Sequence, residues 1–178
     1  YEIPSNNLSF YVIGQRLSYM ETFHKITEKL NMEESLIVNN NIKQLQLVLD
    51  RSIIFDNEFP LNPPDNTMDF RVWLRYMRDS EKILTSSFHG ICFAIIFRKN
   101  FVCFESHKKN DTRKETILED LGLRDRMISE YDVDKAIELY TQYYNLTNDE
   151  EVKYILDHFD EFKKFIFKEE GYYTGCRS

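Results

Sequence analysis

The stretch that most constrains the fold of this chain is residues 81–106, where strand-like and helix-like patterns alternate. Residues 82–85 form a short apolar run bounded by polar residues, which is typical of a buried strand. Small hydrogen-bonding residues follow at 86–90, and residues 91–97 are apolar on nearly every side, as expected for a helix enclosed by protein. Residues 101–104 have the pattern of a second buried strand. This stretch therefore predicts a strand–helix–strand unit.

The first part of the chain shows the same alternation. Residues 8–13 and 34–38 have the apolar pattern of strands, and between them apolar side chains recur at helical spacing over residues 15–30. Alternating strands and helices indicate a parallel sheet with right-handed crossovers. We therefore predict an α/β fold, with helices flanking a Rossmann-like parallel sheet.

Further helices define the expected domain organisation. Helices are predicted from Asp69, from Thr112 to a stop at Gly122, over 134–144, and from Asn148 to about residue 168. We expect an α/β domain over residues 1–146, followed over 147–178 by an amphipathic helix and a frayed tail. Residues 42–59 fit either a helix or a short strand, and the proline-rich segment 60–65 should be a loop.

Charge and cysteine content narrow the classes of function. A net charge of −7 argues against broad binding to nucleic acids or anionic membranes, although a small anionic ligand needs only a few local donors. The three cysteines lack metal-ligand spacing, which predicts no metal site and a reducing cytoplasm. No run reaches the roughly 18 apolar residues of a membrane-spanning helix. The start without methionine and close to a strand suggests a piece of a longer protein.

The first candidate site is the turn that follows the predicted strand 82–85. Ligands of open α/β sheets bind at the carboxyl ends of the strands, and anions prefer helix N-termini. His89 is expected to act at this turn as an acid or a hydrogen-bond donor toward an anion. The alternative is that His89 only caps the helix. Ser86 and Ser87 fit hydroxyl donors to a phosphate or carboxylate, with Gly90 allowing close backbone approach; the alternative is ordinary N-capping.

Several cations are expected near the same edge of the sheet. Arg113 follows the next strand and can grip an anion through two parallel hydrogen bonds, although a solvated loop is the alternative. For Lys108 and Lys109 the position in a solvated loop is favoured over anion binding. Arg16 faces either the cleft or the surface at a helix start. The sequence lacks a G-x-G-x-x-G fingerprint, an H-E-x-x-H motif, a G-x-S-x-G elbow and a Walker loop.

Taken together, these residues resemble the polysaccharide pyruvyl transferase family from about Leu8 to Arg126. The similarity rests on five segments: Phe70-Arg71-Val72-Trp73-Leu74, Ile83-Leu84-Thr85-Ser86-Ser87-Phe88-His89-Gly90, Phe93-Ala94-Ile95-Ile96-Phe97-Arg98-Lys99-Asn100-Phe101, Thr112-Arg113, and Leu118-Glu119-Asp120-Leu121-Gly122-Leu123-Arg124-Asp125-Arg126. The resemblance implies two Rossmann-like domains, as in GT-B glycosyltransferases, of which this chain is the C-terminal half. It also implies transfer of the enolpyruvyl group of phosphoenolpyruvate to two sugar hydroxyls, which forms a pyruvate ketal and releases phosphate.

The resemblance assigns roles and partners to this chain. His89 matches the motif histidine that meets the donor phosphoenolpyruvate, and Arg113 matches a recurrent arginine suited to anion binding. No cofactor or metal is implied. The expected partners are a saccharide or lipid-linked oligosaccharide acceptor of bacterial exopolysaccharide synthesis and the missing N-terminal domain, against which the tail helix would pack. The fragment alone is expected to be inactive, and to lie in the cytoplasm or at the inner face of the membrane.

Two other functions remain open. One is a glycosyltransferase half that binds a nucleotide-sugar at the same edge, with a glutamate for the ribose. The other is a non-catalytic binding domain of the same fold.

Overall fold

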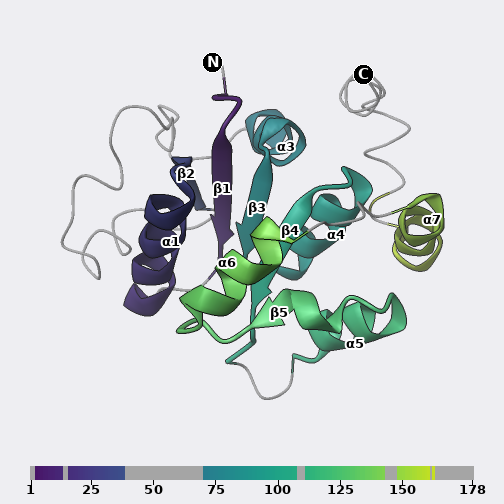
Figure 1. Ribbon diagram of the computed structural model, residues 1–178. Coiled ribbons are helices and arrows are strands. Elements are labelled where there is room, and N and C mark those ends of the chain that lie inside the picture. The colour runs from purple at the N-terminus through teal and green to yellow at the C-terminus, as the bar shows by residue number, and fades with distance from the viewer. Residues whose placement is uncertain are drawn as a thin grey trace.

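A parallel sheet forms the centre of the computed structural model, which describes residues 3–13, 16–38, 70–107, 111–142, 148–160 and 162 (Figure 1). Within these residues the sheet has five strands in the order β2-β1-β3-β4-β5, and every neighbouring pair is parallel. The strands are β1 (Asn7–Val12), β2 (Glu33–Val38), β3 (Lys82–Thr85), β4 (Asn100–Phe104) and β5 (Met127–Ile128). The chain moves outward from β1 in one direction and from β3 in the other, so the topological switch point lies between β1 and β3.

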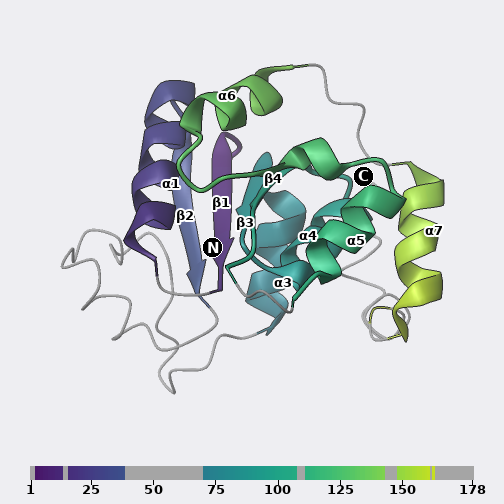
Figure 2. The ribbon, with the colours of Figure 1, turned by 90° about the horizontal axis from the view of Figure 1, so that it is seen from below.

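Helices cover both faces of the sheet, as Figures 1 and 2 show. The helices are α1 (Leu17–Leu30), α3 (Phe70–Asp79), α4 (Phe88–Ile96), α5 (Arg113–Asp120), the 3-10 helix η2 (Arg124–Arg126), α6 (Val133–Thr141) and α7 (Asp149–His158). On one face α1 contacts α6; on the other α4 contacts α3 and α5. α7 packs against the outer side of α4. The predicted α/β fold, with helices flanking a parallel sheet, is confirmed.

α4 lies in the core of the protein, which is why nearly all of its residues are apolar. Cys92 and Ile95 of this helix are fully buried, because α3, α7 and the sheet surround it. The indole ring of Trp73 in α3 meets the ring of Phe93 edge-on at 4.9 Å, and Phe162 meets Phe93 at 5.1 Å. An all-apolar helix is stable only in such an enclosed position.

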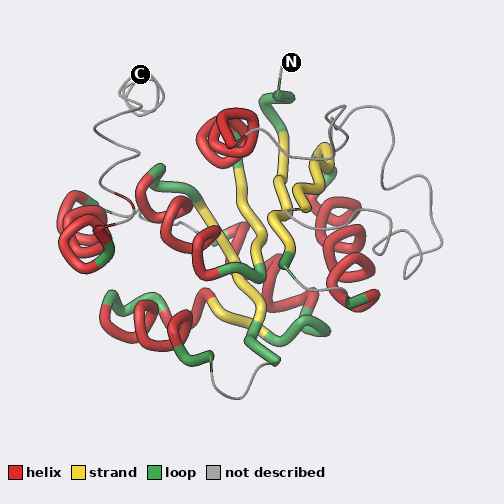
Figure 3. The backbone as a smooth tube through the Cα atoms, turned by 180° about the vertical axis from the view of Figure 1, so that it is seen from behind, coloured by secondary structure: helices red, strands yellow, loops and turns green. Residues whose placement is uncertain are grey.

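Most predicted elements agree with the structure to within a few residues, as the run of helices and strands in Figure 3 shows. The two-residue strand β5 is absent from the prediction. The tail helix begins at Asn148 as predicted, where a capping box closes its first turn, but the regular helix ends at His158. α7 contacts α4, and its residues Val152 and Ile155 are buried. The predictions for residues 42–59 and 60–65, for the last part of the tail helix from residue 163 and for the tail 171–178 lie outside the described residues.

No helix in the described part of the chain combines the length and the apolar character needed to cross a membrane.

Candidate functional site

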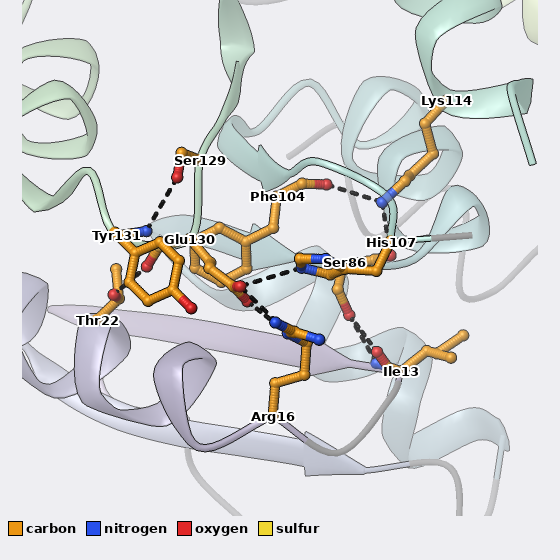
Figure 4. A network of polar contacts seen from close by, with 10 residues as sticks. All are labelled: Ile13, Arg16, Thr22, Ser86, Phe104, His107, Lys114, Ser129, Glu130 and Tyr131. Carbon is orange, nitrogen blue, oxygen red and sulfur yellow. Dashed lines mark hydrogen bonds and ion pairs between the residues drawn. The ribbon is translucent and has the colours of Figure 1, made fainter. Parts of the chain in front are cut away.

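The carboxyl edge of the sheet brings together the residues that follow four of its strands (Figure 4). Ile13 follows β1, Ser86 follows β3, His107 follows β4 and Glu130 follows β5. These segments come from distant parts of the sequence and meet because parallel strands end at the same edge. The edge includes the switch point between β1 and β3, where open α/β sheets bind their ligands.

His89 is the second residue of α4, and its side chain is exposed at this edge. The imidazole ring lies 5.7 Å from the ring of Phe88 and 5.9 Å from the ring of Phe162. The aromatic neighbours hold the ring beside the positive end of α4, where an anion is stabilised. The structure therefore places the His89 imidazole at the N-terminus of α4, and its role toward an anion stays a prediction.

The two serines have structural partners within the protein. The hydroxyl of Ser86 donates to the carbonyl of Ile13 at 2.8 Å and accepts from its N–H at 2.7 Å, which joins the ends of β3 and β1. Ser87 is buried, and its hydroxyl oxygen caps α4 by accepting from the N–H of Gly90 at 3.3 Å. Ser87 is therefore the N-cap of α4, which was the alternative to anion binding. Ser86 instead links the ends of two neighbouring strands.

Gly90 is required by packing. A Cβ atom at this position would lie 2.2 Å from Oγ1 of Thr85 and 2.9 Å from its Cβ. Thr85 is buried and donates to the carbonyl of Tyr11 at 2.8 Å, so it is not free to move aside. The absence of a side chain at Gly90 lets the first turn of α4 lie directly on β3.

Arg113 lies close to the start of α4, although it belongs to α5. Its guanidinium carbon is 4.8 Å from the ring centre of Phe88, the residue before His89. Nε donates to Asp111 at 3.1 Å, and this hydrogen bond holds the pKa of Asp111 below its ordinary value. The structure thus brings Arg113 and His89 to the same aromatic ring. Lys108 and Lys109 lie outside the described residues.

Lys114 is a buried cation at the edge that the sequence did not single out. Its ammonium group donates to the carbonyls of Phe104 at 2.7 Å and Ser86 at 3.1 Å, so it bridges the ends of β4 and β3. Burial lowers its pKa, an effect that nearby Cys103 and Glu115 oppose. In the sequence, Lys114 is one of several cations that follow β4, and no local pattern distinguishes it from Lys108 and Lys109.

A second polar cluster surrounds Glu130, whose side chain is 2% exposed. The Nε–H of Arg16 donates to both carboxylate oxygens at 2.9 and 3.1 Å, and Nε2 of His107 lies 3.1 Å from Oε1. Burial raises the pKa of Glu130, but hydrogen bonds from Arg16 and Ser18 and the charge of His107 outweigh it, so the pKa lies below its ordinary value. Arg16 therefore faces the edge rather than the open surface. Glu130 and His107 carry no local sequence motif that would have revealed them.

Arg126, from the family-like segments, and Cys103, in β4, have structural roles. The Arg126 side chain is buried and donates to the carbonyls of Phe101 at 2.8 Å and Leu139 at 3.4 Å. Cys103 is buried as well, and burial raises the pKa of its thiol to about 12, which makes it an inert core residue. In the described part of the chain no cluster of histidine, cysteine and carboxylate side chains has the arrangement of a metal site.

An all-parallel sheet with cations at its carboxyl edge places the chain among the doubly wound α/β proteins that bind ligands at that edge. A family model described as polysaccharide pyruvyl transferase matches residues 11–108, more than half of the sequence and including His89. The chain belongs to the polysaccharide pyruvyl transferase family, as its sequence motifs predicted. Membership implies a transferase with a saccharide acceptor. Comparisons with curated proteins and with solved structures gave no match.

Proposed function

We propose that this chain binds phosphoenolpyruvate at the carboxyl edge of its sheet and takes part in transfer of the enolpyruvyl group to a saccharide. The observation that carries the proposal is His89, exposed at the start of α4, with Arg113 on the adjoining face of Phe88. The match to the family model supports the reaction class. The exposed cations suit a small, highly anionic donor even though the whole chain is acidic.

The proposed reaction has two additions to the same carbon. Protonation of the methylene carbon of phosphoenolpyruvate makes its C2 carbon electrophilic, and one sugar hydroxyl adds there. Cleavage of the C2–O bond releases phosphate, and a second hydroxyl then adds to C2 and completes the ketal. Of the two protons lost by the hydroxyls, one replaces the proton given to the methylene carbon and the other leaves with phosphate. His89 acts either as the acid that protonates the methylene carbon or as the donor that stabilises the departing phosphate. Arg113 and the N-terminus of α4 stabilise the anionic donor.

The proposal extends to the wider setting of the reaction. The acceptor is a saccharide or lipid-linked oligosaccharide of bacterial exopolysaccharide synthesis, and the second wall of the site comes from an N-terminal domain arranged as in GT-B enzymes. The protein works in the cytoplasm or at the inner face of the membrane, and the chain alone is inactive. These statements depend on the family and await a test.

Substitution of His89 tests the catalytic role. In the full-length protein, His89→Ala and His89→Gln should both abolish ketal formation and phosphate release, because neither variant can protonate carbon or carry charge. Circular dichroism should show an unchanged fold. His158→Gln changes an exposed histidine on α7 and serves as the matched control with retained turnover. Retained turnover in His89→Gln would overturn the assignment.

Ligand binding separates this function from the alternatives. Thermal stabilisation of the chain should be greater with phosphoenolpyruvate than with UDP or GDP. Arg113→Gln should weaken the effect of phosphoenolpyruvate. Preferential stabilisation by UDP or GDP would instead indicate a nucleotide-sugar donor.

A further inference from the structure

The cluster around Glu130 lies on the opposite side of the sheet from His89. Arg16 precedes α1, which covers one face, whereas His89 and Arg113 begin helices that cover the other face. His107 and Glu130 follow β4 and β5 and complete the cluster at the same carboxyl edge (Figure 4). The edge therefore has two groups of cations, and the proposed donor site accounts for one.

The charge balance of this cluster favours an anion. One buried carboxylate, Glu130, contacts the guanidinium of Arg16, which balances its charge, and also the imidazole of His107, which adds positive charge when it is protonated. The N-terminus of α1 adds partial positive charge, because Arg16 makes no side-chain cap and the first turn of α1 contains no acidic residue. A purely structural ion pair would require only one cation for Glu130.

The cluster is both accessible and held in place. The side chains of Arg16 and His107 are 40% and 44% exposed, whereas Glu130 beneath them is buried. The Thr22 hydroxyl donates to the Glu130 carbonyl, and the Nε–H of Arg16 binds the carboxylate. Figure 4 shows the guanidinium group of Arg16 beside the Glu130 carboxylate.

Apolar side chains border the same place. The large hydrophobic residues that are exposed in the described ranges are Ile13, Leu17 and Tyr131, and each lies within three residues of Arg16 or Glu130 in sequence. Exposed apolar groups beside buried charge are typical of a ligand site. An ion pair with a purely structural role would not require exposed apolar side chains beside it.

We propose that Arg16 and His107, held by Glu130, form a second oxyanion-binding site at the carboxyl edge, for a phosphate or carboxylate group of a small-molecule ligand. The source of the oxyanion rests on the proposed function: it is either the carboxylate of phosphoenolpyruvate or a phosphate on the saccharide acceptor. Both present the same chemistry to Arg16, which binds through charge-assisted hydrogen bonds.

Histidine NMR tests the site directly in the 178-residue chain. The ring signals of His24, His89, His107 and His158 are assigned with single His→Gln variants and followed during titration with inorganic phosphate at constant ionic strength. The His107 signal should shift with saturation. Arg16→Gln should weaken this binding about tenfold, the equivalent of ~1.4 kcal/mol. Lys29→Gln removes an exposed cation of α1 that pairs with Asp134, and should leave the affinity unchanged.

Titrations with phosphoenolpyruvate and glucose 1-phosphate identify the source. Joint shifts of His89 and His107 with phosphoenolpyruvate support the donor carboxylate; a shift of His107 with glucose 1-phosphate alone supports an acceptor phosphate. An unresponsive His107, or unchanged affinity in Arg16→Gln, would overturn the second site without affecting His89. A response of His107 to phosphate with no response of His89 to phosphoenolpyruvate would support the second site and contradict the proposed function.

Discussion

Gly90 and Thr85 set the position of His89 through a contact that only glycine permits. The first turn of α4 lies so close to β3 that a Cβ atom at Gly90 would overlap Oγ1 of Thr85, at 2.2 Å. Thr85 is fixed by two hydrogen bonds, donating to Tyr11 and accepting from the N–H of Ser87 at 3.0 Å. The contact therefore joins the helix cap, the strand and the adjacent His89.

Gly90→Ala should destabilise the protein by about 1–3 kcal/mol, because the added methyl must displace a buried, hydrogen-bonded side chain. Urea denaturation at pH 7 measures the loss. Gly122→Asn provides the control: Gly122 has φ +72°, a Cβ atom there would meet no described atom within 4 Å, and asparagine tolerates this conformation. Equal stability of Gly90→Ala and the wild type would show that α4 can move away from β3 without cost.

Residue-level prediction from the sequence succeeded where the signal was local. The exposed position of His89 at a helix start follows from the apolar run after it and the small residues before it. The partner of the Ser86 hydroxyl lies 73 residues away at Ile13, and Glu130 is 114 residues from Arg16. No spacing rule connects residues so far apart, so these roles required the three-dimensional arrangement of the strands.

At the scale of elements, hydrophobic periodicity identified the long helices and the buried strands. It could not identify very short elements. β5 has two residues, Met127 and Ile128, too few for an alternating pattern to appear. The end of α7 was missed for a different reason. The apolar spacing continues through Phe159 and Phe162, but Phe159 is the C-cap that ends α7. Its ring packs onto Phe88, and Phe162, where the backbone is helical again, packs onto Phe93 of α4.

α7 is expected to be part of the cooperative core. Ile155→Ala should destabilise the chain by about 2–5 kcal/mol, because Ile155 is fully buried where α7 packs on α4. Lys153→Ala on the exposed side of the same helix is the matched control and should change stability by less than about 0.5 kcal/mol. Thermal or urea unfolding followed by circular dichroism measures both. A small effect of Ile155→Ala would mean that α7 is dispensable for the α/β domain.

The whole molecule combines an acidic composition with a cationic edge. The net charge is −7, yet Arg16 follows β1, and the basic side chains of His107, Arg113 and Lys114 follow β4, at the carboxyl edge of the sheet. The fold produces this separation because the loops that follow parallel strands share one edge. The acidic composition argued against an extended basic surface. The topology of the sheet is what shows that several basic side chains lie at one edge.

Acid stability should depend on the carboxylate beneath that edge. The pKa of Glu130 in the folded protein lies below its ordinary value of 4.5, because hydrogen bonds from Arg16 and Ser18 outweigh burial. The unfolded chain therefore takes up the proton first. The stabilisation from Glu130 is complete above about pH 5 and is lost as the pH falls through the folded-state pKa.

Glu130→Gln should accordingly flatten the decline in unfolding free energy between pH 7 and pH 3, measured by urea denaturation at several pH values. Arg16→Gln should also reduce the slope, because it removes the main hydrogen bond that lowers the pKa. The double variant should match Glu130→Gln. Some slope remains in every variant, since the pKa values of Glu34 and Asp111 are lowered too. A Glu130→Gln curve parallel to that of the wild type would show that the pKa of Glu130 is not lowered in the folded state.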